Sequence, residues 1–160
     1  MRRIIIEKGV KYHTYLKNLF AAMENEQLNY NWLITDCVCY PESKVYDELF
    51  QRDYLWLSGR ELTNIFMEED FQMIWGMFSA FKPNLTLDEV LKYKLPQNQD
   101  NDRSRDLYDP QVLPKHPLAE VEIQAVDSSF TMIISKNDGL VQHVTKAFPQ
   151  YQEFSDFFKK

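Results

Sequence analysis

The sequence contains little glycine: four residues in 160, none of them adjacent to another. A dinucleotide-binding turn needs glycines spaced G-x-G-x-x-G, and a phosphate-binding P-loop needs two glycines ahead of a lysine. The nucleophile elbow of the α/β-hydrolases needs Gly-x-Ser-x-Gly. None of these patterns is present, so the common nucleotide-dependent enzymes and hydrolases are disfavoured, and we assign no catalytic residues.

Cysteine is also scarce, with Cys37 and Cys39 as the only two. A disulfide between residues so close in sequence cannot connect distant parts of the fold. A structural zinc site needs four ligands, more than two cysteines supply. The three histidines, His13, His116 and His143, are far apart in the sequence. We therefore expect two strand cysteines that pack as small apolar side chains, no bound metal and no cofactor. A nucleophilic cysteine paired with a histidine is the less favoured alternative.

Long apolar runs are missing from the N-terminus, where only Ile4 to Ile6 are consecutive apolar residues. Such a run is far shorter than a signal-peptide core or a membrane span, so we expect a cytoplasmic protein with no membrane association. A chain of 160 residues that is 44% hydrophobic and 14% aromatic can build its own core. We therefore expect a single domain, residues 1–160, with a long exposed, proline-rich loop at residues 95–117.

The spacing of apolar residues and capping signals predicts alternating groups of strands and helices. The expected strands are 4–6, 30–40, 54–57, 71–81, 121–126 and 130–134. The expected helices are 11–23, 60–67, 87–93 and 138–148. Since strands mostly follow strands, we predict an α+β fold. Its sheet would be mixed or mostly antiparallel, with about six strands and three to four helices packed on it.

Charge is distributed unevenly along this acidic chain, whose net charge is −6. Residues 1–23 carry a net charge of +4, whereas residues 24–70 hold eleven acidic and three basic side chains. An acidic protein repels a phosphate backbone, so we expect no nucleic-acid binding. The least favoured function is nucleic-acid binding through the basic N-terminal residues Arg2, Arg3, Lys8 and Lys11.

Aromatic residues are concentrated in the acidic middle segment, and aromatic side chains beside charged ones are typical of protein-binding surfaces. Our leading hypothesis is therefore a non-catalytic interaction protein whose partner is another protein, for example a basic toxin or enzyme. The residues expected to bind it are Tyr46, Asp47, Glu48, Asp53, Tyr54 and Trp56. The alternative is a small-ligand-binding protein or an unfamiliar enzyme, with a pocket between sheet and helices lined by Trp32, Trp75 and Tyr54.

Three stretches of the chain stand out together: Asn29–Ile34, Gly59–Leu62 and Val126–Phe130. They resemble an uncharacterised family of small bacterial proteins, known mainly from Gram-positive spore-formers. That family is known only as a domain of unknown function, so the resemblance implies no activity. In size, acidity and aromatic content the chain is also similar to the immunity proteins of bacterial toxin systems.

Overall fold

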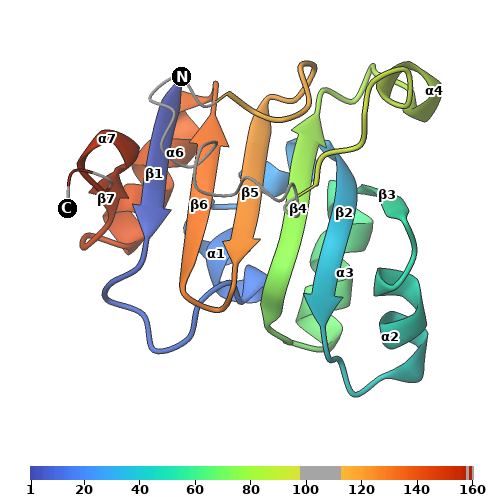
Figure 1. Ribbon diagram of the computed structural model, residues 1–160, viewed down its shortest axis with the longest axis horizontal. Coiled ribbons are helices and arrows are strands. Elements are labelled where there is room, and N and C mark those ends of the chain that lie inside the picture. The colour runs from blue at the N-terminus through green and yellow to red at the C-terminus, as the bar shows by residue number, and fades with distance from the viewer. Residues whose placement is uncertain (98–112, 158, 160) are drawn as a thin grey trace.

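The computed structural model describes residues 1–97, 113–157 and 159. Within these residues, seven strands form one sheet in which every pairing is antiparallel. The strands are β1 (Arg2–Ile6), β2 (Asn31–Cys39), β3 (Tyr54–Ser58), β4 (Met73–Phe81), β5 (Val121–Val126), β6 (Phe130–Ser135) and β7 (Gln152–Glu153). Their order across the sheet is β3-β2-β4-β5-β6-β1-β7, so β3 and β7 form its two edges (Figure 1).

Six α-helices and one 3-10 helix accompany these strands in the described part of the chain. They are α1 (Leu16–Ala22), η1 (Glu26–Asn29), α2 (Lys44–Phe50), α3 (Gly59–Glu68), α4 (Leu87–Val90), α6 (Asp138–Ala147) and α7 (Phe154–Phe157). Helices α1, α3 and α6 cover one face of the sheet and build the larger hydrophobic core with it (Figure 1). No helix among the described residues is both long and apolar enough to cross a membrane.

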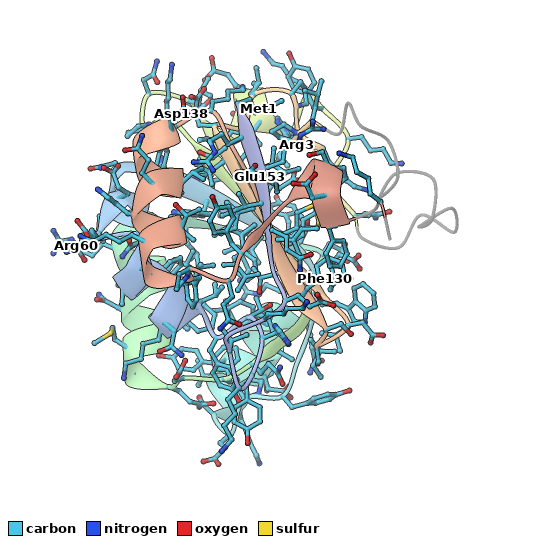
Figure 2. The ribbon with its side chains drawn as sticks, turned by 90° about the vertical axis from the view of Figure 1, so that its left-hand side faces the viewer. Met1, Arg3, Arg60, Phe130, Asp138 and Glu153 are labelled. Atoms are coloured by element: carbon cyan, nitrogen blue, oxygen red, sulfur yellow. The ribbon has the colours of Figure 1, made fainter. Side chains whose placement is uncertain are left out.

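The opposite face of the sheet carries two smaller apolar clusters. One lies near the β7 edge and consists of Ile5, Met132, Ile134 and Phe154. The other lies nearer β3 and consists of Leu33, Phe81, Val90 and Ala119. Figure 2, which views the molecule from the β7 side, shows α6 and α7 on opposite sides of β1. The sheet is therefore covered on both faces at this end.

The predicted α+β fold with a mostly antiparallel sheet is confirmed, with seven strands rather than about six. The additional strand, β7, has only two residues, too few for a periodic pattern to reveal. Helix α2 is not among the expected helices, since no element is predicted between residues 41 and 53. In the structure Ser43 caps this helix: its hydroxyl accepts a hydrogen bond from the backbone N–H of Tyr46 at 3.4 Å.

The first helix begins at Leu16, five residues later than the spacing of apolar residues predicts. The reason lies in Thr14, whose φ is 53° and whose carbonyl accepts a 3.0 Å hydrogen bond from the backbone N–H of Met73. Tyr15 then forms an isolated antiparallel bridge with Gln72. The segment before α1 is therefore tied to the start of β4 in an extended form.

Strand β2 contains a bulge that its sequence pattern does not predict. Asp36 has a φ of 53°, and the register with β4 shifts just beyond Thr35. A bulge disturbs the alternation of side chains along a strand. Cys37 and Cys39 therefore pack with the same core as Ile34, whereas simple alternation predicts them on the opposite face.

Most of the loop predicted at residues 95–117 falls on residues 98–112, which lie outside the described residues. Its described ends are exposed in part: Gln97, Leu113 and Pro117 are exposed, whereas Pro96 and His116 are buried. The His116 ring packs edge-on against Phe81, with ring centres 4.7 Å apart. These ends of the loop therefore help to cover the cluster nearer β3.

Candidate functional site

The six residues predicted to bind a partner lie at one end of the molecule, where α2 meets the β3 edge (Figure 1). Tyr46, Asp47 and Glu48 belong to α2, and Asp53 lies in the turn before Tyr54. The structure brings them to one end but divides them between the two sides of the sheet. We call this region the edge surface; it comprises Tyr46, Asp47, Glu48, Leu49, Arg52, Asp53, Tyr54, Trp56 and Leu57.

Helix α2 is held in place by two acidic side chains of the segment that ends α3. The Glu69 carboxylate accepts hydrogen bonds from the backbone N–H groups of Glu42 and Ser43, at 2.7 and 2.9 Å. The Tyr46 hydroxyl donates to Glu68, and this bond raises the pKa of Tyr46. Glu68 and Glu69 therefore have a structural role.

The two acidic residues of α2 itself, Asp47 and Glu48, make no ion pair among the described residues. Glu48 is exposed and Asp47 is half-buried. Asp53, which is exposed in the turn before β3, also makes no ion pair among these residues. These three carboxylates and the exposed Arg52 are therefore the charges that the edge surface offers to solvent, and their sum is negative.

On β3, the side chains of Tyr54 and Trp56 share one face because side chains alternate along a strand. Both are half-buried against the cluster nearer β3, and the Trp56 ring centre is 5.7 Å from that of Phe81. Leu55 and Leu57 point to the other side and pack with the larger core. The edge strand thus presents aromatic side chains on one side and leucines on the other.

An open hollow of about 400 Å³ runs along the edge surface. Its lining consists of Leu49, Arg52, Asp53, Tyr54, Leu55, Trp56 and Leu57. A second hollow of about 470 Å³ lies at the bulge of β2, and both are lined by Arg52 and Asp53. The edge surface is therefore grooved.

The alternative pocket predicted from Trp32, Trp75 and Tyr54 is not formed, because these residues lie in different places. Trp32 is fully buried in the larger core, and its indole N–H donates to the Gln27 carbonyl at 3.0 Å. A Cβ atom at Gly76 would point toward Phe78 and Met73, which belong to the larger core. Trp75 is the preceding residue of β4, so its side chain points to the opposite face of the sheet. Tyr54 lies at the sheet edge.

A cavity of about 540 Å³ does exist between sheet and helices, under the loop that follows β1. Its apolar lining includes Ile6, Val10, Leu19 and Phe148. Its polar lining includes Lys11, His13, Asn18, Asp70 and the threonines Thr14 and Thr131. Sequence reasoning missed this site because the loop, β6, α1 and the end of α6 meet only in the folded chain.

Several polar groups of this loop cavity have defined surroundings. The hydroxyls of Thr14 and Thr131 are 2.6 Å apart and share a hydrogen bond. The Nδ1 atom of His13 is buried and has no hydrogen-bond partner in the described part of the chain. Burial raises the pKa of Asp70, although the nearby charge of Lys17 opposes this effect. A concave, mainly apolar space with a few polar groups is typical of a small-molecule site.

The basic residues considered for nucleic-acid binding are not gathered into one patch. Arg2 forms a 2.5 Å ion pair with Glu153, which raises the pKa of Arg2. Its neighbour Arg3 points to the opposite face of β1, because side chains alternate along the strand. Lys8 and Lys11 lie in the loop that follows. The N-terminal charge is therefore spread over different surfaces.

The two cysteines are free thiols packed against the larger core. Burial raises the pKa of both, that of Cys39 to about 12, where the nearby charges of Asp47 and Glu69 add to the effect. A reactive cysteine needs a lowered pKa, so neither residue has the environment of a nucleophile. Within the described residues, no three His, Cys, Asp or Glu side chains are placed to hold a metal ion.

One buried ionisable group was not singled out from the sequence. The alternation along β5 suggests that Glu122 faces solvent, but its side chain is fully buried. Its carboxylate accepts hydrogen bonds from the Lys115 backbone N–H at 2.7 Å and from the Gln124 amide at 2.6 Å. Burial raises its pKa to about 7. Because it is closed off from solvent, we assign it a structural role.

Comparison with known proteins identifies a family but no function. A family model described as "Protein of unknown function (DUF2691)" matches residues 1–98. This agrees with the resemblance to an uncharacterised family; the matched region contains two of the three stretches, while Val126–Phe130 lies beyond it. No curated protein and no solved structure matches the chain.

Proposed function

The chain belongs to the DUF2691 family, whose function is unknown, and from its edge surface we propose that it is a non-catalytic protein that binds another protein. The observation that carries this proposal is a grooved, acidic surface along β3, an edge strand of the sheet that the described residues form. Half-buried aromatic side chains, here Tyr54 and Trp56, are typical anchors of protein interfaces.

The charge of the edge surface favours a basic partner. Asp53 lines the groove, and Asp47 and Glu48 directly precede Leu49, which also lines it. None of the three acids makes an ion pair among the described residues. They belong to the segment 24–70, in which acidic side chains outnumber basic ones by eleven to three. Complementary charge of this kind speeds association and selects partners.

Exposed apolar side chains close to these acids support the same proposal. Tyr40 is 77% exposed just after β2, and Val45 is 70% exposed in the first turn of α2. Single exposed apolar residues are common. Val45, however, lies one helical turn before Leu49, which lines the groove, so a partner seated on the edge surface is within reach of it.

Affinity capture from the native cell lysate tests the proposal. We expect the tagged wild-type protein to retain a stoichiometric protein at low salt and to lose it at high salt, because exposed charges are screened. The triple variant Asp47→Asn, Glu48→Gln, Asp53→Asn should retain at least tenfold less of it, with mass spectrometry as the readout.

The matched control removes three negative charges elsewhere, with Asp88→Asn, Asp127→Asn and Asp138→Asn. All three of these aspartates are exposed, and none belongs to the edge surface. Their removal should leave capture unchanged. If the two triple variants retain the partner equally well, or if the wild-type protein retains nothing, the proposal is wrong.

The loop cavity supports small-ligand binding as a second candidate function. Its volume of about 540 Å³ lies in the usual range for small-molecule sites, roughly 300–1,000 Å³. A thermal-shift screen against small molecules with one apolar and one polar end tests it. The exposed rim residue Asn18 on α1 can be changed to Trp to block the entrance, with Asn64→Trp on the outside of α3 as the matched control. A ligand that stabilises all three proteins equally does not bind in this cavity.

A further inference from the structure

The direction of the backbone groups along β3 follows from its register with β2. The Gly59 backbone N–H donates to the Tyr30 carbonyl at 2.9 Å, one step beyond the paired residues Asn31 and Ser58. In an antiparallel pair, residues that exchange hydrogen bonds alternate with residues that do not. The Ser58 backbone N–H fits this pattern, because it points away from β2 and donates to the Glu61 carboxylate at 2.7 Å.

The same alternation places the next residues of β3. The N–H and C=O groups of Leu55 and Leu57 face β2, whereas those of Tyr54 and Trp56 point out of the sheet. Within the described residues, β3 pairs with β2 alone (Figure 1). The outward groups of Tyr54 and Trp56 therefore line the groove as unpaired donors and acceptors of an edge strand.

Strand β3 lacks the features that usually protect a sheet edge. Natural edge strands are blocked by charged residues, prolines, bulges or very short length. The sequence of β3, Tyr-Leu-Trp-Leu-Ser, has no charge and no proline, and its register with β2 is continuous. The opposite edge is protected: β7 has two residues, and its Glu153 is paired with Arg2. Among the described residues, no strand thus pairs with the outer side of β3.

The charges around the groove select between the possible occupants. A second copy of this chain would bring the same net negative charge, that of three carboxylates against Arg52, and net charges of like sign oppose association. A basic segment would meet opposite charges. Building on the proposed function, we propose that β3 binds an extended, basic segment of the partner protein as an additional strand of the sheet.

The two sides of β3 define what the added strand carries. Its side chains alternate between Leu49 and Leu57 on one side and Tyr54 and Trp56 on the other. The segment therefore has apolar or aromatic residues at its centre and lysine or arginine toward the end that lies beside Asp53, just before β3. Main-chain hydrogen bonds supply affinity in this mode of recognition, and the alternating side chains supply specificity.

A phage-displayed library of random twelve-residue peptides, selected on the full chain, provides the probe. Each selected peptide is then titrated against Tyr54→Pro and Tyr54→Val. Both variants lose the tyrosine ring, but only proline removes an outward N–H, and proline is tolerated at the first residue of an edge strand. We expect selected peptides to be basic and to bind Tyr54→Pro at least tenfold more weakly than Tyr54→Val.

Amide hydrogen exchange of the wild-type protein gives a second readout that does not depend on the proline variant folding. The Trp56 amide should exchange at least tenfold more slowly with a selected peptide bound, while the Leu57 amide, already paired with β2, changes little. The inference is overturned if no basic peptide is selected, if the two variants bind alike, or if Trp56 exchange is unaffected. Lysate capture sensitive to the acidic triple variant would still stand in that case, so the two proposals can fail separately.

Discussion

The side-chain amide of Gln124 donates a 2.6 Å hydrogen bond to the carboxylate of Glu122, and both side chains are buried on the same face of β5. The Lys115 backbone N–H donates to the other carboxylate oxygen at 2.7 Å. Burial disfavours the charged carboxylate and these bonds favour it. Burial dominates, and the pKa of Glu122 is raised to about 7. Glu122 therefore couples the stability of the fold to pH near neutrality.

We expect Glu122 to make the protein less stable as pH rises from about 4.5 to about 8. The pKa of this group is 4.5 before folding and about 7 in the folded protein, so the folded state keeps a proton that the unfolded state has lost. The stabilisation is complete below pH 4.5 and is lost as pH rises through 7. At about 1.4 kcal/mol per pKa unit, it is on the order of 3 kcal/mol.

Urea unfolding of the wild type and of Glu122→Gln at several pH values measures this effect. Glutamine keeps the size of the side chain and one of its two accepting oxygens and cannot ionise. Its NH2 group replaces the other oxygen and can donate to the Gln124 side-chain oxygen once the Gln124 amide turns over. The variant should therefore lose most of the pH dependence between pH 5 and 8 and be more stable than the wild type at the upper end. A variant with the same pH dependence as the wild type would show that another group is responsible.

Gly59 at the start of α3 is expected to tolerate no side chain. A Cβ atom there would lie 2.1 Å from the Gln27 carbonyl oxygen and 2.8 Å from the Leu28 Cα, both of which are backbone atoms. The chain around η1 would have to move, and overpacking of this kind costs about 3 kcal/mol or more. Gly59→Ala should lower the free energy of unfolding by at least that amount in urea denaturation.

Gly139 provides the matched control for this substitution. It is exposed in the first turn of α6, and a Cβ atom would approach only the Asn137 side-chain oxygen, at 3.3 Å. Alanine is favoured over glycine inside a helix by up to about 1 kcal/mol. Gly139→Ala should therefore leave stability within about 1 kcal/mol of the wild type. Equal effects of the two substitutions would contradict the close approach at Gly59.

The positions of the strands along the chain were largely predictable from the sequence. Which strands lie next to one another in the sheet was not. The hairpin of β5 and β6 follows from alternation and a short turn, and the capping box of Ser58 and Glu61 correctly begins α3. The pairing of β1 with β6 joins Ile4 to Ile133, and no local pattern connects residues so far apart. That β3 lies at an edge follows only from the complete strand order.

The candidate site shows the same division between local and long-range information. Helix α2 was detectable, because Tyr46, Leu49 and Phe50 have helical spacing after the cap at Ser43. The left-handed residue Asp36 was not, since its bulge appears only in the register with β4. The predicted binding residues are close in sequence and lie at one end of the fold. The side of the sheet that each residue faces could not be predicted, because it depends on the presence of α2 and on the position of β3 at the edge of the sheet.

Cys37 and Cys39 should react slowly with thiol reagents in the folded protein. Burial raises the pKa of both thiols, that of Cys39 from 9.0 to about 12. At pH 8 this lowers the thiolate fraction of Cys39 about 1,000-fold, and only the thiolate reacts. A disulfide reagent that releases a coloured thiolate measures the rate with and without urea. Labelling of the native protein less than tenfold slower than in urea would contradict the buried thiols.

The segment that defines the family, residues 1–98, should not fold without the rest of the chain. Strand β1 pairs only with β6 and β7 among the described strands, and both lie beyond residue 98. Without them, Ile4 and Ile6 lose their place in the sheet, and β4 loses its neighbour β5. The three remaining strands, β3, β2 and β4, would keep a core open on one side.

Circular dichroism during urea denaturation can compare fragment 1–98 with the full chain. We expect a cooperative transition for residues 1–160 and none for the fragment, because burial of the larger core requires β5 and β6. Addition of a separate peptide of residues 113–160 should restore part of the transition, since it supplies β5, β6 and β7. A fragment 1–98 that unfolds cooperatively by itself would mean that β1 finds another partner, and that the sheet order seen in the full chain is not required for folding.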